Sequence, residues 1–191
     1  MLFRSFKYLE KSVKTADPEA REKMHNASTM AGMAFANAFL GMSHSMAHKI
    51  GAVHHTIHGR TNAILLPYVI RYNGTRPSKT TTWPKYNYWK ADEKFQDIAR
   101  MLGLPCSTPE EAVEAYAKAV YDLGEAVGIT MNFKGFGIDE KAWKDSLHEI
   151  ALLAYEDQCS PANPRLPMVA DMEEIMADAY YGYAERPGRR K

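Results

Sequence analysis

GMSHSMAHKIGAVHHTIHGRTNAILLPYVIRYN, residues 41–73, combines a histidine cluster with apolar segments of helical character. Five of the seven histidines fall in this stretch, at positions 44, 48, 54, 55 and 58. His44 and His48 are four residues apart in a predicted helix, so both side chains leave the same face, one turn from each other. His58 lies just beyond the predicted end of that helix, where a turn can bring it back toward the pair. Neutral imidazole is a common ligand of transition metals, and a metal site needs this kind of convergence.

Spacing alone leaves the role of this cluster open. A histidine pair in a helix is more often a surface or polar-core feature than a metal site, because a two-residue motif is weak. This pair follows a strongly apolar helix, however, and a third histidine lies within reach. Lone imidazoles fit zinc, iron, copper or nickel, and no carboxylate lies inside the cluster to favour iron. The pattern therefore permits a metal site and does not choose the metal.

Upstream of the cluster, Asp17-Pro18-Glu19 predicts a helix start. Asp17 can cap the helix, Pro18 suits the first helical position and Glu19 favours the positive end of the helix dipole. Good helix formers continue from there toward Gly51, which predicts one long helix. A stripe of small residues runs along it at three- and four-residue spacing: Ala27, Ala31, Ala34 and Ala38. Such a stripe lets a neighbouring helix approach closely, so we expect this helix to be central to the domain.

Downstream, the chain predicts further helices separated by short breakers. A turn near His58-Gly59 should precede an apolar helix over 63–70, and helices are expected over 92–102, 109–127, from Asp139 onward, and over about 168–181. Thr108 and Glu111 form the pattern of a capping box. Residues 73–90, 132–137 and 159–167 are expected to be irregular or loop segments. No alternating strand pattern of useful length and no internal repeat occurs, so the predicted class is all-α.

Composition narrows the classes of function. The 191 residues allow one domain, and 46% hydrophobic and 25% charged residues with a net charge of +1 are typical of a soluble globular protein. Nucleic-acid binding is not expected, because the only basic run is the C-terminal segment 186–191, which reads as a solvated tail. The most apolar stretch, 30–42, is too short to cross a bilayer, and the start lacks a signal-peptide core. Two distant cysteines suit free thiols in a reducing cytoplasm.

Several segments strongly resemble the signature of the iron-containing alcohol dehydrogenases: 41–52, His58-Gly59, 62–67 and 69–73, with 20–32 matching as well. Residues 157–165, DQCSPANPR, resemble the closing segment of the alcohol dehydrogenase part of bifunctional aldehyde–alcohol dehydrogenases. The resemblance covers about residues 1–183 and leaves 184–191 as a basic tail. It implies the helical, bundle-like C-terminal metal-binding domain of the dehydroquinate synthase-like, or iron alcohol dehydrogenase, fold.

The resemblance also implies the site residues. Family members hold a divalent metal, usually Fe²⁺ and sometimes Zn²⁺, through one Asp and three His in the cleft between a nucleotide-binding domain and the helical domain. His44 and His58 match the last two of those ligands. His48 matches a pocket histidine with roles in proton transfer, and is the predicted catalytic residue. The Asp, the first His and the NAD(H)-binding segment would lie upstream of where this chain begins. Ile57 and Arg60 depart from the family pattern beside His58.

The function implied for the complete enzyme is reduction of a small aldehyde, acetaldehyde to ethanol, with NADH as hydride donor. This chain alone is expected to be inactive, because it offers two of the four ligands and no nucleotide-binding domain. The uncovered face of the domain should favour self-association or docking to an aldehyde–alcohol dehydrogenase assembly. The alternative is a non-catalytic interaction or assembly module. A metal hydrolase or metal-storage domain is a third, weaker interpretation.

Overall fold

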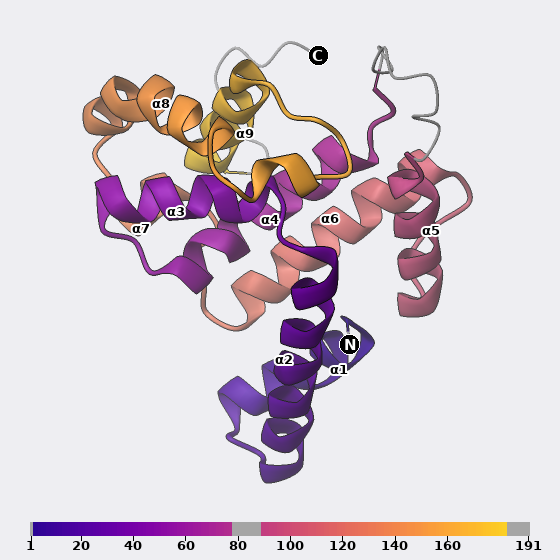
Figure 1. Cartoon of the computed structure of the whole chain (residues 1–191). Helices are drawn as coiled ribbons and strands as arrows, with labels where there is room; N and C mark the ends of the chain where they lie inside the picture. The colour runs from indigo at the N-terminus through magenta and orange to yellow at the C-terminus, as the bar shows by residue number, and fades with distance from the viewer. Residues whose placement is uncertain (1, 78–88, 183–191) are drawn as a thin grey trace.

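The computed structural model describes residues 2–77 and 89–182, and within these ranges the chain is helical without a strand (Figure 1). The predicted all-α class is therefore confirmed. The elements are α1 (Leu2–Lys14), α2 (Pro18–Ala38), α3 (Met42–His54), α4 (His58–Gly74), α5 (Ala91–Leu102), α6 (Pro109–Ala126), α7 (Phe133–Phe136), α8 (Glu140–Tyr155), the 3₁₀ turn η1 (Ser160–Ala162) and α9 (Val169–Tyr181). The predicted basic tail, 184–191, lies outside the described residues. So do residues 78–88 of the predicted irregular segment 73–90.

Local capping starts three of these helices as predicted. The carboxylate of Asp17 accepts a hydrogen bond from the Ala20 N–H at 2.8 Å, and Asp139 accepts one from Ala142 at 2.9 Å. Thr108 caps α6 by accepting from the Glu111 N–H at 3.2 Å. The Glu111 carboxylate accepts a hydrogen bond from the backbone N–H of Ser107, the residue before the cap, at 2.6 Å. These bonds satisfy N–H groups that have no partner within the helix.

The long helix expected from residue 18 toward Gly51 is broken, and that expectation was wrong. The first part, α2, ends at Ala38, and Phe39 takes a positive φ of 63°. Gly41 is extended and stands before a new helix, α3. The Asn163 carboxamide oxygen lies 3.3 Å from the Met42 N–H, so a distant loop contributes to the start of α3. Tertiary contacts therefore override the helix propensity of this stretch.

Two further boundaries differ from expectation. The turn between the histidine-bearing helices lies at residues 55–57, and His58 is already the first residue of α4. The expected loop 132–137 contains the short helix α7, whose first turn is capped by Asn132. Both differences are a few residues in size, the scale on which helix ends fray and reassign.

The small-residue stripe does not place α2 at the centre of the described structure. Ala27 is buried, but Ala34 and Ala38 are exposed. The helix packs on α1, and the pair projects from the rest of the molecule (Figure 1). Large apolar side chains on α2 are exposed as well, among them Met33 at 64%. Within the described residues, the Ala34 and Ala38 end of the stripe is therefore not covered by a neighbouring helix.

The main core lies where α3, α4, α8 and α9 meet. Its fully buried side chains include Met46 and Ile50 of α3, Leu65 of α4 and Met176 of α9. A second cluster joins the end of α4 to α5 and α6 through Ile70, Val113 and Tyr116. The buried face of α3 is therefore fixed by the core, and its opposite, more polar face carries His44 and His48.

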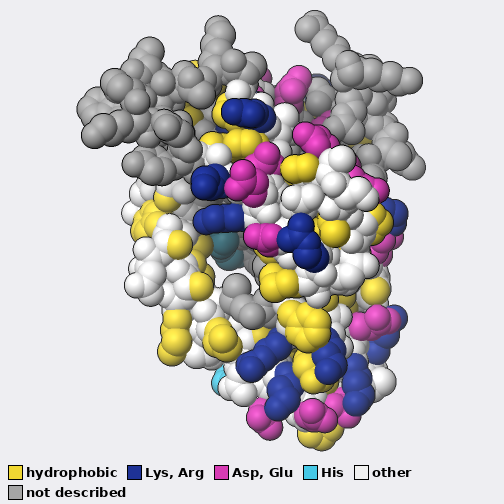
Figure 2. All heavy atoms as spheres, turned by 90° about the vertical axis from the view of Figure 1, so that its right-hand side faces the viewer, with side chains coloured by type: hydrophobic (Ala, Val, Ile, Leu, Met, Phe, Trp, Pro, Cys, Tyr) yellow, Lys and Arg dark blue, Asp and Glu magenta, His cyan; other side chains and the backbone are white. Residues whose placement is uncertain are grey.

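One face of the described structure is mixed in charge. On the face shown in Figure 2, Lys and Arg side chains are interspersed with Asp and Glu, and hydrophobic side chains are exposed between them. Among the described helices, none combines the length and the apolar character needed to cross a membrane.

Candidate metal centre

Three histidines from two helices converge. His44 and His48 lie one turn apart on α3, with ring centroids 6.3 Å apart. His58 approaches both: its ring centroid is 5.3 Å from that of His44 and 5.3 Å from that of His48. The link between the helices is short, and His55 in it adopts the left-handed conformation with φ 54°. This reversal returns the start of α4 to the face of α3, as the spacing predicted.

The separations fit a shared metal ion. Two imidazoles bound tetrahedrally to one ion, with metal–nitrogen bonds of about 2.0–2.1 Å, have ring centroids roughly 5 Å apart. The His44 and His58 rings, assigned as ligands by resemblance, meet this condition. Burial, and then the neighbouring His58 and His48, lower the pKa of His44 below its usual 6.5. A neutral imidazole with a free lone pair is the form that binds a metal.

Asn62 and Ser43 fix the surroundings of His58. The Asn62 amide nitrogen lies 3.2 Å from His58 Nε2 and donates to the His58 carbonyl at 3.2 Å. Its amide oxygen accepts from the Ser43 hydroxyl at 3.0 Å. A neutral imidazole has a single lone pair, so a metal bound through either ring nitrogen would replace the hydrogen bond from the Asn62 amide nitrogen to His58 Nε2. Sequence reasoning gave Asn62 no role, although its position four residues after His58 on a helix is a usable signal.

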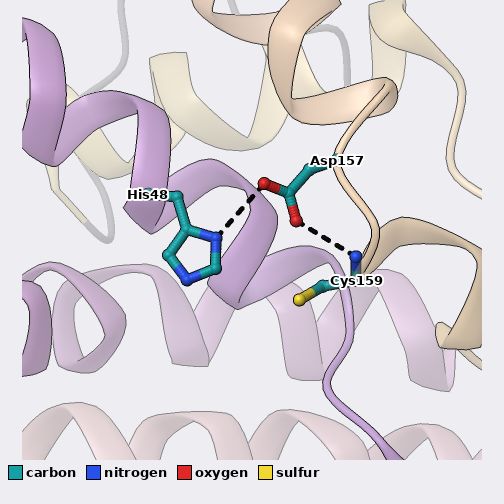
Figure 3. A group of neighbouring side chains, drawn as sticks. All are labelled: His48, Asp157 and Cys159. Carbon is teal, nitrogen blue, oxygen red and sulfur yellow. Dashed lines mark hydrogen bonds and ion pairs between the residues drawn. The ribbon is translucent and has the colours of Figure 1, made fainter.

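The structure adds a carboxylate that sequence spacing did not reveal. Asp157 follows α8, and its Oδ2 lies 3.2 Å from His48 Nδ1 and 3.0 Å from Lys49 Nζ. Its Oδ1 accepts the backbone N–H of Cys159 at 3.0 Å (Figure 3). The Asp157 side chain is only 8% exposed. Because 109 residues separate it from His48, only the packing of α3 beside the end of α8 brings them together.

Asp157 is ionised in this setting. Burial raises the pKa of its carboxyl, but hydrogen bonds from the Cys159 backbone, Lys49 and His48 outweigh burial and hold that pKa well below its usual 3.8. The Cys159 thiol behaves oppositely, since burial and then its hydrogen bond to Asp157 raise its pKa.

Donor atoms of His48, Asp157 and Cys159 lie within 4.8 Å of one another. A metal there would have to displace Lys49 from Asp157. The Cys159 thiol, whose pKa is raised, would also have to lose its proton. The arrangement therefore favours a hydrogen-bonded ion pair over a second metal site.

The remaining histidines of the cluster are not brought to this centre. His54 Nε2 lies 3.0 Å from the Ser146 hydroxyl, and the ring stacks on Trp143 at 5.3 Å. Burial, followed by the charge of His55, lowers the pKa of His54. His55 is exposed in the turn. The cationic group of Arg60 lies 5.4 Å from the ring centroid of Phe136, on α7.

Comparison with known proteins shows the family to which the chain belongs. The profile of the Fe-containing alcohol dehydrogenase family, C-terminal, matches residues 5–180. The aldehyde-alcohol dehydrogenase of Streptococcus pneumoniae serotype 2 (strain D39) is 79% identical over 186 residues, 97% of this chain and 21% of its own length. The bifunctional aldehyde-alcohol dehydrogenase of Escherichia coli (strain K12) is 39% identical over 169 residues, 87% of this chain and 19% of its own.

Solved structures with a similar fold include members of the same family. A 1,3-propanediol oxidoreductase superposes with a TM-score of 0.77 at 32% identity, covering 93% of this chain and 42% of that one. An iron-containing alcohol dehydrogenase from Thermococcus thioreducens has a TM-score of 0.77 at 33% identity, covering 94% and 42%. The chain thus spans about a fifth of the length of the curated relatives above. It belongs to the iron-containing alcohol dehydrogenase family and corresponds to the C-terminal, all-helical domain of that family.

Proposed function

We propose that this chain is the metal- and substrate-binding domain of an iron-dependent, NAD(H)-linked alcohol dehydrogenase that reduces a small aldehyde, acetaldehyde to ethanol. The observation that carries the proposal is the 5.3 Å separation of the His44 and His58 rings beside His48. The domain is proposed to occupy residues 1–183, with 184–191 as a basic tail. Its two cysteines are free where described, which suits a cytoplasmic protein.

The residues divide into two roles. His44 and His58 would hold Fe²⁺ or Zn²⁺ through neutral imidazole nitrogens, and the lowered pKa of His44 favours that form. When bound, the ion supplies a Lewis acid that polarises the aldehyde carbonyl. His48, whose side chain is 35% exposed, exchanges a proton with the oxygen of the product and with solvent. Asn62, itself held by the Ser43 hydroxyl, contacts His58 Nε2 and would hold the ring in place until a metal takes the lone pair.

A polypeptide of these 191 residues alone is proposed to be inactive. His44 and His58 bring no negative charge to a divalent cation, and the carboxylate of Asp157 is already engaged by Lys49 and His48. By resemblance, the anionic ligand, a third histidine and the NAD(H) site come from another part of the complete enzyme. Weak metal binding and no hydride transfer follow for the chain by itself.

A chimera tests this function. The matching C-terminal segment of the pneumococcal aldehyde-alcohol dehydrogenase is replaced by this chain, and NADH oxidation with acetaldehyde is measured after loading with iron. We expect alcohol dehydrogenase activity, and loss of both bound metal and that activity in His44→Ala and His58→Ala. The matched control is His55→Ala, an exposed histidine outside the centre, which should keep both. A folded but inactive chimera, or an active His44→Ala variant with its metal retained, would refute the proposal.

A second candidate function is that of a non-catalytic assembly module. The exposed apolar side chains Met30, Met33, Phe35 and Phe39, each 45–64% exposed, support it, since such surface favours association. Sedimentation of the chain with and without Met33→Lys tests association. Oligomers that dissociate in the variant, together with an inactive chimera, would favour this second function. A chain that sediments as a monomer at all concentrations would refute the assembly function.

A further inference from the structure

We propose that Asp157 is a positioning residue for His48: its carboxylate holds the imidazole with the proton on Nδ1 and leaves Nε2 as the free acceptor. The catalytic meaning of this arrangement rests on the proposed function. The proton position itself is a property of the chain and can be measured without metal or substrate.

The hydrogen bond dictates the tautomer. Asp157 Oδ2 lies 3.2 Å from His48 Nδ1, and an ionised carboxylate can only accept. The hydrogen must therefore be on Nδ1. A neutral imidazole carries one N–H, so Nε2 keeps its lone pair. Figure 3 shows this second nitrogen on the side of the ring away from Asp157.

The carboxylate is held in place independently of His48. Asp157 and Cys159 form a tight turn after α8, in which the Cys159 N–H bonds Oδ1 at 3.0 Å and the Ser160 N–H bonds the Asp157 carbonyl at 3.0 Å. With 8% of its side chain exposed, Asp157 has little freedom to move. A fixed acceptor locks the orientation of the ring that it contacts.

Lys49 forms an ion pair with the carboxylate that contacts His48. Its ammonium lies 3.0 Å from Asp157 Oδ2, the same oxygen that faces His48. Lys49 follows His48 directly on α3, so both side chains contact the same carboxylate, that of Asp157. Lys49 and His48 therefore share one carboxylate oxygen as their acceptor. A neutral, oriented imidazole is the form that can accept a proton at Nε2 and return it.

The test is the tautomer of His48 in chelator-treated, ¹⁵N-histidine-labelled chain at about pH 8.5, where histidine is ordinarily neutral. Long-range ¹H–¹⁵N spectra distinguish the two ring nitrogens, and His48→Gln assigns the signals. We expect the proton on Nδ1 in the wild type and a shift toward Nε2, the form that free histidine favours, in Asp157→Ala. Lys49→Met, which removes the other partner of the same oxygen, should keep the wild-type pattern. A wild-type proton on Nε2, or an unchanged pattern in Asp157→Ala, would overturn the proposal.

Kinetics in the chimera separate this inference from the proposed function. Asp157→Ala should lower kcat by about 10–100-fold, the range for partners of active-site groups, with KM and bound iron little changed. Asp157→Asn, which keeps an accepting oxygen, should recover part of kcat. Loss of iron in Asp157→Ala would overturn the positioning role, because Asp157 would then support the metal. An inactive chimera with the expected tautomers would refute the function and leave the orientation of His48 standing.

Discussion

Asn163→Ala should destabilise the whole domain, because this buried side chain joins three segments. The Asn163 amide nitrogen donates to Asn73 Oδ1 at 2.7 Å and to the Arg165 carbonyl at 2.6 Å. Its oxygen faces the Met42 N–H at 3.3 Å and the Asn73 amide at 3.4 Å. Asn163 and Asn73 are only 5% and 7% exposed, so water cannot readily replace these partners. The start of α3, two residues before His44, depends on this junction.

The magnitude follows from the two short bonds. Removing one partner of a buried hydrogen bond costs about 1–3 kcal/mol for the group left behind. Two such groups give roughly 2–6 kcal/mol, and the two longer contacts add little. For a chain of this size, about 1 kcal/mol shifts Tm by roughly 2–4 °C, so a loss near 3 kcal/mol corresponds to about 6–12 °C.

Urea unfolding followed by circular dichroism measures the loss. The matched control is Asn37→Ala on the exposed part of α2, where the change should stay within about 0.5 kcal/mol. The double variant Asn73→Ala/Asn163→Ala should cost at least about 1 kcal/mol less than the sum of the single variants, since both lose one shared contact. A cost below about 1 kcal/mol for Asn163→Ala, or strict additivity, would refute the reasoning.

Three further predictions concern the frame around the site. Gly74→Ala places a methyl carbon 2.5 Å from Val113 Cγ2, so we expect a loss of about 1–3 kcal/mol in urea unfolding, smaller in a Val113→Ala background. Thr108→Ala removes the cap of α6 and should cost about 1 kcal/mol, with faster amide exchange confined to the first turn of α6. The pKa of Asp157 is lower in the folded chain than the ordinary 3.8 of the unfolded chain, so its stabilisation is complete from about pH 5 upward and is lost as the pH falls toward the folded pKa. The stability difference between wild type and Asp157→Asn should therefore shrink from about pH 5 downward, and a widening difference would contradict the assignment.

The sequence by itself determined the helices and the histidine pair. Asp17 and Thr108 mark real helix starts because a cap bonds N–H groups within three residues, a purely local event. His44 and His48 share a face because helical geometry puts residues four apart one turn from each other. The family signature was likewise readable from residues 41–73, and the matching profile bears it out.

Only the tertiary structure decided where the chain breaks and what surrounds His48. Local propensity extended one helix past Phe39, whereas the structure bends there and begins α3 against Asn163. The alanine stripe predicted a central helix, yet α2 packs only its buried side on α1 and leaves Ala34 and Ala38 exposed, because a stripe permits a close partner and does not supply one. Asp157 reaches His48 across 109 residues of chain. Hydrogen bonds and burial of that kind depend on which segments pack together, and no local pattern encodes such packing.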